Sequence, residues 1–258
     1  MNPIKSIYYD YLNFKLSHFT ITKEGHALRR LKDIHSGCRC FIVGNGPSLR
    51  ADDLEKITRN HDISFACNRI YHIFEKTSWR PQYYISQDER MLRGCQEEVN
   101  QIPCKLKFIP AELAWYSDIN INNALLYHLT YDRECQPDFS EDIASCIENS
   151  KTVVYTAIQI AVYMGIREIY LIGVDHHFHI SQNSKNEILI DNTVRNYFTE
   201  EYDSDREKLE IPNLEVSTLT YVAAKEYADA NGIHIYNATR GGKLDVFERR
   251  NFDDLFGK

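Results

Sequence analysis

The sequence lacks several features that mark common classes of protein. It contains no run of about 20 apolar residues, so no membrane-spanning helix is expected. Lys5, Asp10 and Lys15 interrupt the apolar residues near the N-terminus, which argues against a signal peptide. The net charge is −7, whereas a general nucleic-acid binder needs a basic face. We therefore expect a cytoplasmic protein that does not bind nucleic acid.

The cysteines also lack an informative spacing. Their number is odd, and no Cys-x-x-Cys pair occurs. This pattern predicts free, reduced thiols rather than a zinc site or a disulfide framework, for all seven: Cys38, Cys40, Cys67, Cys95, Cys104, Cys135 and Cys146. No Gly-x-Ser-x-Gly motif is present, so a hydrolase triad has no support.

What the sequence does contain is a regular alternation of strand-like and helix-like segments. Strand-like runs cover residues 38–43, 62–67, 82–86, 105–109, 168–172 and 233–236, and helix-like stretches cover 51–58, 88–99, 153–164 and 216–231. Continuous apolar strands in such an alternation predict an α/β fold, a Rossmann-like and mostly parallel sheet with helices on both faces. A chain of 258 residues is long enough for one such domain with a full core.

Three regions stand outside this scheme. Residues 1–35 predict an N-terminal helical appendage, followed by a Rossmann-like nucleotide-binding catalytic domain over 36–258. The appendage is interpreted as a helical lid packed on the domain or on a second subunit, or else as a segment that rests on the inner membrane surface. Residues 110–150 lack clear periodicity, and the polar residues 180–212 predict a long lid-like loop, with a solvated surface excursion as the alternative.

The most informative segment follows the first strand. Its apolar residues run into a glycine turn before a helix, a junction that directs backbone N–H groups at one point and holds phosphate in α/β proteins. The spacing matches neither the dinucleotide fingerprint nor the ATPase P-loop, so an ordinary tight turn remains the alternative. The candidate phosphate-binding residues are Gly44, Asn45, Gly46, Pro47 and Ser48.

Other strand ends carry polar residues as well. Because ligands bind beyond the carboxyl ends of parallel strands, we expect these residues to surround one site. Each has a structural alternative, since Asn and Asp also cap turns and Gly241-Gly242 also turns the chain. The candidates are Asn68, Arg69, Asp88, Asp175, His176, His177, Thr239 and Arg240.

The histidines near Asp175 suggest acid–base chemistry more than metal binding. His176, His177 and His179 lie within four residues, but a strand or loop cannot easily turn all three towards one ion. We therefore predict no metal site and assign proton transfer to one of these histidines. Asp175 is a candidate to accept a proton, bind Mg²⁺ or anchor a substrate hydroxyl.

Four motifs in order resemble a known family. They are Phe-Ile-Val-Gly-Asn-Gly-Pro-Ser-Leu at 41–49 and the segments 65–71, 169–175 and 235–239. Together they resemble the 6-hydroxymethylpterin diphosphokinase-like domain family, over about residues 38–250. Its bacterial members are often encoded with surface-polysaccharide or flagellin-glycosylation genes. The family is similar to the family 42 sialyltransferases and the motility-associated (Maf) nonulosonic acid transferases.

The resemblance implies roles for individual residues. The sialyltransferase relatives bind a CMP-sugar without a metal or other cofactor. By this resemblance Asn45, Gly46 and Ser48 meet the donor phosphate, Asn68 the ribose or sugar, and Thr152 lies near the nucleotide.

This chain departs from the sialyltransferase pattern at three points. Ser150 stands where those enzymes have an Arg, although Lys151 is adjacent, and His177 stands where they have a Tyr that helps the leaving phosphate. Their general-base His lies before the last long helix, but residues 180–231 of this chain contain no histidine. The catalytic candidates are therefore Asp175, His176 and His177.

The resemblance leaves three functions open. The first is a glycosyltransferase that moves a sugar from a nucleotide donor, a CMP-linked nonulosonic acid or similar, to a glycan or lipid-linked acceptor in bacterial surface glycan assembly. The second is a Mg²⁺-dependent diphosphokinase acting on a pterin-like substrate, with Asp88 or Asp175 on the metal. The third is a non-catalytic nucleotide-binding protein. Homo-oligomers and a peripheral membrane contact are further expectations.

Overall fold

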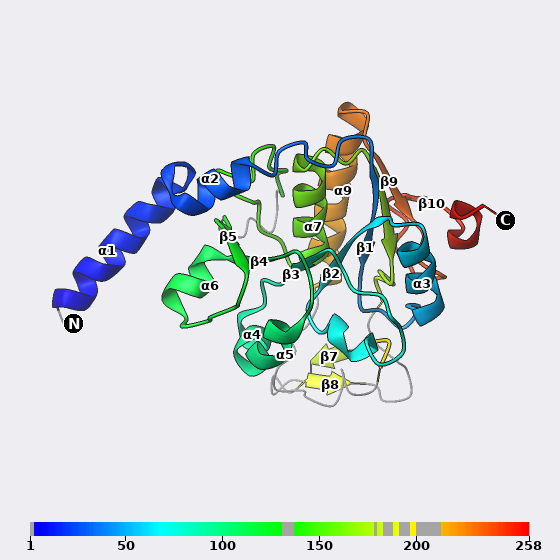
Figure 1. Ribbon diagram of the computed structural model, residues 1–258, viewed down its shortest axis with the longest axis horizontal. Helices are drawn as coiled ribbons and strands as arrows, with labels where there is room; N and C mark the ends of the chain where they lie inside the picture. The colour runs from blue at the N-terminus through cyan, green and yellow to red at the C-terminus, as the bar shows by residue number, and fades with distance from the viewer. Residues whose placement is uncertain are drawn as a thin grey trace.

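The computed structural model describes residues 3–130, 137–177, 180–182, 188–190, 197–199 and 213–257 (Figure 1). One sheet of eight strands, all parallel, has the order β10-β9-β6-β1-β2-β3-β4-β5. A separate antiparallel pair consists of β7 (Ile180–Gln182) and β8 (Ile188–Ile190). The strands of the large sheet are β1 (Arg39–Val43), β2 (Ile63–Cys67), β3 (Tyr83–Ile85), β4 (Leu106–Pro110), β5 (Ala124–Tyr127), β6 (Glu168–Ile172), β9 (His234–Asn237) and β10 (Glu248–Arg249).

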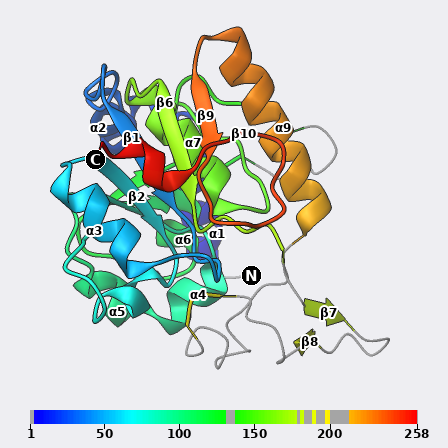
Figure 2. The same ribbon diagram turned by 90° about the vertical axis from the view of Figure 1, so that its right-hand side faces the viewer.

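Helices cover both faces of the sheet, as the alternating pattern predicted (Figures 1 and 2). The α/β, Rossmann-like fold class is therefore confirmed. The described helices are α1 (Pro3–Ser17), α2 (Lys23–Arg29), α3 (Ala51–Arg59), α4 (Glu89–Gly94), α5 (Gln96–Gln101), α6 (Ala111–Tyr116), α7 (Val153–Tyr163) and α9 (Leu214–Ala230), with 3-10 turns η1 (Phe19–Ile21), η2 (Ile70–Ile73) and η4 (Phe252–Leu255).

The two faces form two separate apolar cores because successive strand residues point to opposite sides. In β1, Cys40 and Ile42 face the core built around α7, whereas Phe41 and Val43 face the core built around α3. The same alternation continues through β6. Helix α7 is buried on nearly every side, which explains why its sequence is apolar all round rather than amphipathic.

Six strands and four helical stretches were predicted, and the structure contains elements at all of these places. The predicted helix over 88–99 is divided at Cys95 into α4 and α5. The region 110–150, which lacked periodicity, contributes α6 and β5, and β10 was also missed. These elements are six residues long or shorter, so no periodic pattern can develop within them.

The N-terminal region is helical over α1, η1 and α2, and its two helices differ in how they pack. Helix α1 projects from the body (Figure 1), whereas Phe19 and Leu28 are buried in the core around α7. Helix α2 packs against the edge strand β5. No helix among the described residues is long and apolar enough to cross a membrane.

Most of the predicted lid over 180–212 lies outside the described residues, as do His179 and Cys135. The described parts are β7, β8 and residues 197–199. The six described cysteines are free thiols.

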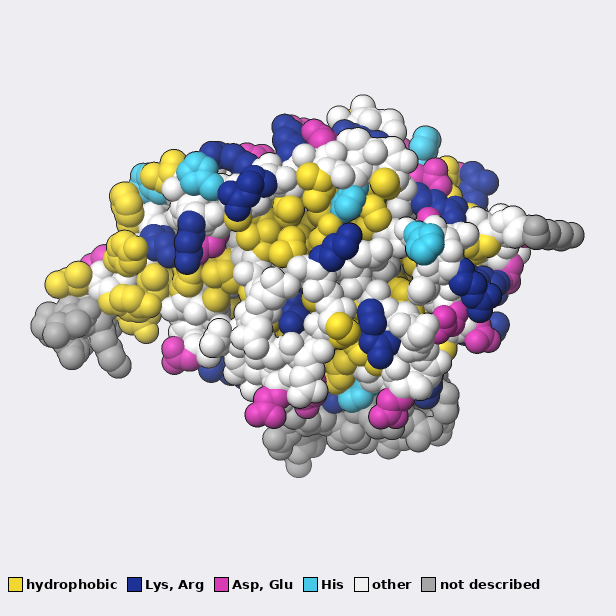
Figure 3. Space-filling model, in the orientation of Figure 1, with side chains coloured by type: hydrophobic (Ala, Val, Ile, Leu, Met, Phe, Trp, Pro, Cys, Tyr) yellow, Lys and Arg dark blue, Asp and Glu magenta, His cyan; other side chains and the backbone are white. Residues whose placement is uncertain are grey.

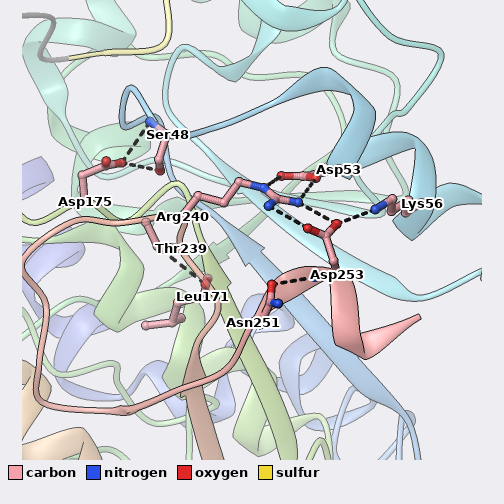
Figure 4. A network of polar contacts seen from close by, with 9 residues as sticks. All are labelled: Ser48, Asp53, Lys56, Leu171, Asp175, Thr239, Arg240, Asn251 and Asp253. Carbon is pink, nitrogen blue, oxygen red and sulfur yellow. Dashed lines mark hydrogen bonds and ion pairs between the residues drawn. The ribbon is translucent and has the colours of Figure 1, made fainter. Parts of the chain in front are cut away.

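Arg240, at the end of β9, ties the C-terminal segment to α3 (Figure 4). Its guanidinium donates two hydrogen bonds to Asp53, at 2.8 and 2.9 Å, and two more to Asp253. Lys56 of α3 donates to the same Asp253. These bonds raise the pKa of Arg240 further above its usual range. The network is one reason why α3 and η4 share one side of the sheet.

We expect Arg240→Ala to lower the free energy of unfolding by about 1–2 kcal/mol, because it leaves the nearly buried carboxylate of Asp53 without its cation. The loss is smaller than for a fully buried ion pair, because water screens the partly exposed guanidinium. Urea denaturation measures this change. The matched control is Lys225→Ala, which breaks an exposed pair with Asp229 and should cost at most about 0.5 kcal/mol. Equal losses in both variants would contradict a stabilising role for Arg240.

Candidate functional site

A cavity of about 360 Å³ lies at the carboxyl ends of the central strands. The segments that follow β1, β2, β3 and β6 line it, together with the N-terminus of α7 and one side of α9. This is the edge of the sheet at which parallel α/β proteins bind ligands. Among the predicted site residues, those that line the cavity are Gly44, Asn45, Gly46, Asn68, Arg69, Asp88, Thr152, Asp175, His176 and His177.

Four predicted site residues do not line this cavity: Pro47, Ser48, Thr239 and Arg240. Thr239 is buried, and its hydroxyl accepts a hydrogen bond from the Val174 amide at 3.1 Å. Arg240 points towards α3, as described above. The expectation that the end of β9 faces the ligand is therefore wrong for Thr239 and Arg240, which instead hold neighbouring elements together.

The glycine turn after β1 also differs from the prediction. Two of its amides are already bonded, because Gly44 and Gly46 donate to the carbonyls of Ile172 and Gly173, both at 2.8 Å. The Ser48 amide lies 3.4 Å from the carboxylate of Asp175. The segment after β6 therefore takes donors that the sequence-based interpretation assigned to a phosphate.

The glycines serve a close approach between two loops. A Cβ on Gly46 would lie 1.9 Å from Oδ2 of Asp175, and a Cβ on Gly44 would lie 2.5 Å from the carbonyl oxygen of Gly173. Neither distance leaves room for a side chain. The motif therefore encodes the contact of the β1 turn with the end of β6, and the cavity forms beside this contact.

Asp175 acts as a link in this arrangement. Its carboxylate accepts a hydrogen bond of 2.7 Å from the Ser48 hydroxyl (Figure 4), and its carbonyl accepts one of 2.7 Å from the Lys243 amide. Burial raises the pKa of Asp175, while the Ser48 hydrogen bonds and the nearby His177 act in the opposite direction. The side chain thus connects the β1 turn to the segment after β6 and is placed as a positioning residue.

His176 is the best-defined titratable group in the cavity. Its Nε2 lies 2.8 Å from the hydroxyl of Thr218 on α9, and that hydroxyl donates to the Leu214 carbonyl at 2.7 Å. Because a hydroxyl has a single proton, Thr218 accepts from His176, which assigns the imidazole hydrogen to Nε2. Nδ1 of the neutral ring is then the basic nitrogen. Burial lowers the pKa of His176, which favours this neutral form at pH 7.

The N-terminus of α7 supplies the positive side of the cavity. Thr152 caps the helix, and its hydroxyl lies 3.2 Å from the hydroxyl of Tyr221 on α9. Ser150, Lys151 and Val153 line the cavity beside it. Since the first amides of a helix and its dipole favour anions, this end of α7, together with Lys151, is suited to a phosphate.

The ends of β1 and β2 supply amide groups. Asn45 donates from Nδ2 to the Cys67 carbonyl at 3.0 Å, while its Oδ1 is buried and has no hydrogen-bond partner among the described residues. Asn68 has a left-handed backbone (φ 50°), and its Oδ1 accepts from the Ser86 hydroxyl. A buried acceptor without a partner is uncommon, so Asn45 is a candidate ligand-binding group.

The carboxylates at the cavity do not gather around one point. Asp88 caps α4 by accepting from the Met91 amide at 2.9 Å, and Asp175 is bonded to Ser48. In the described parts of the chain, no group of three or more His, Cys, Asp or Glu side chains is placed to hold a metal ion.

Two residues that line the cavity, Lys151 and Tyr221, are not among the predicted site residues. A cation beside the capping residue of an apolar helix, as at Lys151, is a signal that the sequence does contain. Tyr221 lies within α9, far from any strand end, and burial raises its pKa. Nothing in the local sequence distinguishes it from a core tyrosine.

Comparison with known proteins identifies a family and a fold. The family model described as "6-hydroxymethylpterin diphosphokinase MptE-like" matches residues 13–181, which is more than half of the chain. No curated protein matches the sequence.

Two solved structures are similar. A Maf glycosyltransferase from Magnetospirillum magneticum AMB-1 has 17% identity and a TM-score of 0.50 over 90% of this chain. This chain spans only 38% of that longer protein, and at such identity the likeness concerns the fold alone. The sialyltransferase CstII from Campylobacter jejuni, solved with cytidine-5'-monophosphate, has 16% identity and a TM-score of 0.48, over 83% of this chain and 85% of that one.

We expect the His176 ring to titrate below its usual value of 6.5, because burial disfavours the charged form. NMR titration of the ring, assigned by comparison with His176→Asn, measures this pKa. Since the unfolded chain then binds the proton more readily, the free energy of unfolding should fall as the pH drops below 6.5. His176→Asn should reduce that fall, and a pKa at or above 6.5 would contradict the assignment.

Proposed function

We propose that this chain, which belongs to the 6-hydroxymethylpterin diphosphokinase MptE-like family, is a glycosyltransferase that uses a nucleotide-activated sugar. The observation that carries the proposal is the pairing of two features in one cavity. One is a neutral histidine that lines the cavity and whose Nε2 is held by Thr218, and the other is a helix N-terminus with an adjacent lysine. Such a pair suits an attack by a hydroxyl on a carbon whose leaving group is a phosphate.

The donor in this proposal is a CMP-linked acidic sugar of the nonulosonic type. Its phosphate would lie at the first turn of α7, near Lys151 and Thr152. The unpartnered Oδ1 of Asn45 is an acceptor that suits an amino group of a base or a hydroxyl of a ribose. Arg69 also lines the cavity, and its planar guanidinium is suited to a sugar carboxylate.

The reaction would proceed with inversion and without a metal. Nδ1 of His176 takes the proton of the acceptor hydroxyl as the oxygen attacks the anomeric carbon. The bond from that carbon to the phosphate oxygen breaks, and CMP leaves with the bonding electrons. The amides at the start of α7 and the ammonium of Lys151 stabilise the charge that develops on the phosphate.

Asp175 has a supporting role in this scheme, and His177 remains a second candidate for proton transfer. Asp175 fixes the segment that carries both histidines through its bond to Ser48. The acceptor is proposed to be a glycan or lipid-linked hydroxyl in bacterial surface glycan assembly, which would place the protein in the cytoplasm at the inner membrane face.

The family description favours a second candidate, a diphosphokinase acting on a pterin-like substrate. That chemistry uses carboxylates around metal-bound phosphates, and Asp88 and Asp175 both line the cavity. A third candidate is a nucleotide-binding protein without catalytic activity. The nucleotide that stabilises the protein separates the first two functions, and a measurement of turnover separates both from the third.

We expect CMP to raise the melting temperature without Mg²⁺, because the site binds phosphate through amides and Lys151. At a hundredfold excess over Kd the gain is about 2.7 kcal/mol, a rise of several degrees in Tm. Thermal shift with CMP, CTP, ATP and UDP, each with and without Mg²⁺, measures the preference. A response confined to ATP with Mg²⁺ would favour the diphosphokinase, and no response at all would contradict both enzymes.

A lysine pair gives the matched control for this experiment. Lys151→Met should weaken the binding of CMP about tenfold, the effect of one charge-assisted contact to phosphate. Lys225→Met removes a lysine on the outer surface of α9 and should leave binding unchanged.

We expect His176→Asn to lower kcat by about 10²–10⁴-fold while the binding of CMP changes little, because the ring acts on the acceptor proton. Transfer from a CMP-sugar to a hydroxyl acceptor measures kcat, and titration with CMP measures binding. The control is His234→Asn, at the exposed start of β9, which should keep full activity. Full activity of His176→Asn would move the base to another residue, with His177 the first to be tested.

A further inference from the structure

Helix α1 presents large apolar side chains to solvent. The exposed fractions are 70% for Ile7, 56% for Tyr11 and 56% for Phe14, and Ile21 just beyond the helix is 66% exposed. Figure 3 shows the apolar surface over this projecting helix. Elsewhere in the described chain, exposed apolar side chains of this size are few: Ile34, Leu219 and Val222. A patch of this kind on a soluble domain marks an interaction surface.

The exposed side chains follow the spacing of a helix-pairing seam. Ile7, Tyr11, Phe14 and His18 are separated by four, three and four residues, which places them in one stripe along α1. We call these four residues the α1 stripe. Its spacing is that of the a and d positions of a short coiled coil, so the matching surface is another helix.

The other side of α1 already has a partner within the chain. Leu12 is buried, and the ring of Tyr9 stacks on Tyr116 of α6 at 5.8 Å. Asn13 accepts a hydrogen bond of 2.8 Å from the Tyr116 hydroxyl. Because α6 and the body occupy this side, a helix that covers the α1 stripe must come from outside the described fold.

Charge distinguishes a protein partner from a lipid bilayer. Helices that lie on membranes carry Lys and Arg along their polar side. The described side chains on the polar side of α1 are instead Ser6, Asp10 and Ser17, and Lys15 lies beside the stripe with its ammonium 3.6 Å from the centre of the Trp115 ring. The α1 stripe also contains Tyr11 and Phe14, and aromatic residues are typical of protein interfaces.

A second copy of the same helix fits this pattern. Asp10 and Lys15 flank the α1 stripe on its two sides and are five residues apart. In a parallel pair of helices this spacing places Asp10 of one helix beside Lys15 of the other, twice by symmetry. At its C-terminal end the stripe borders a groove of about 480 Å³ lined by α1 and the start of α2, including Ile21, which extends the apolar surface.

We infer that the α1 stripe is the interface of a twofold homodimer, in which two α1 helices pack in parallel with the bodies on either side. The seam is short, so the dimer forms and dissociates with concentration. This inference does not depend on the proposed activity.

The test is the mass of the full chain in solution over a range of concentrations, by light scattering or sedimentation. The mass should rise from 30.2 kDa towards twice that value. Tyr11→Glu with Phe14→Glu should raise the dissociation constant by about 100-fold or more, because like charges then face each other across the seam. Both side chains are exposed, so the fold should be retained, as circular dichroism would verify.

The matched control uses the exposed apolar residues of α9. Leu219→Glu with Val222→Glu adds the same charges to another helix and should leave the dimer intact. In a Cys38→Ser background, which removes the exposed native thiol, Phe14→Cys should form a disulfide-linked dimer under mild oxidation. A mass that stays at one chain at every concentration would overturn the inference. So would stripe-dependent sedimentation with phosphatidylglycerol–phosphatidylethanolamine vesicles in the absence of a dimer.

Discussion

The site depends on the close contact between the turn after β1 and the segment after β6. Two backbone hydrogen bonds, from Gly44 to Ile172 and from Gly46 to Gly173, extend the parallel pairing of β1 and β6 beyond the strands. Ser48 and Asp175 close the contact with a side-chain bond. Because Gly46 has no side chain, the carboxylate of Asp175 can enter the turn. This junction fixes the positions of Gly173 and Asp175, directly before His176.

This contact limits what the turn after β1 can offer to a ligand. A glycine turn between a strand and a helix is ordinarily interpreted as a phosphate loop, but an amide that already donates to a carbonyl is not available to a phosphate. The amides of Gly44 and Gly46 are used in this way at the edge of the sheet. The first turn of α7, beside Lys151, is another place at the cavity where amides favour an anion, and our proposal puts the donor phosphate there. The turn after β1 lines the cavity through Gly44, Asn45 and Gly46.

The sequence was sufficient to predict the parallel sheet, because six of its strands are apolar runs and five strand ends carry polar residues. It was also sufficient to bring Asn68, Asp88 and Asp175 to one edge, since that follows from parallel topology alone. It was not sufficient for β5 and α6, whose few residues carry no periodic signal. Local sequence also does not indicate which distant element a side chain will contact. Arg240 pairs with Asp53, 187 residues away in the chain, and Tyr221 reaches the cavity from the middle of a helix.

The packing of α2 has a consequence for where this domain begins. Phe19 and Leu28 fill the core around α7, and α2 lies against β5, which is the last strand of the sheet. A chain shortened to start near residue 36 would expose the apolar side chains of the core against which Phe19 and Leu28 pack. Exposed apolar surface of this kind promotes association between molecules. The smallest unit that folds cleanly therefore includes the segment from about Phe19 onward, and recombinant fragments trimmed closer to β1 would be prone to aggregate.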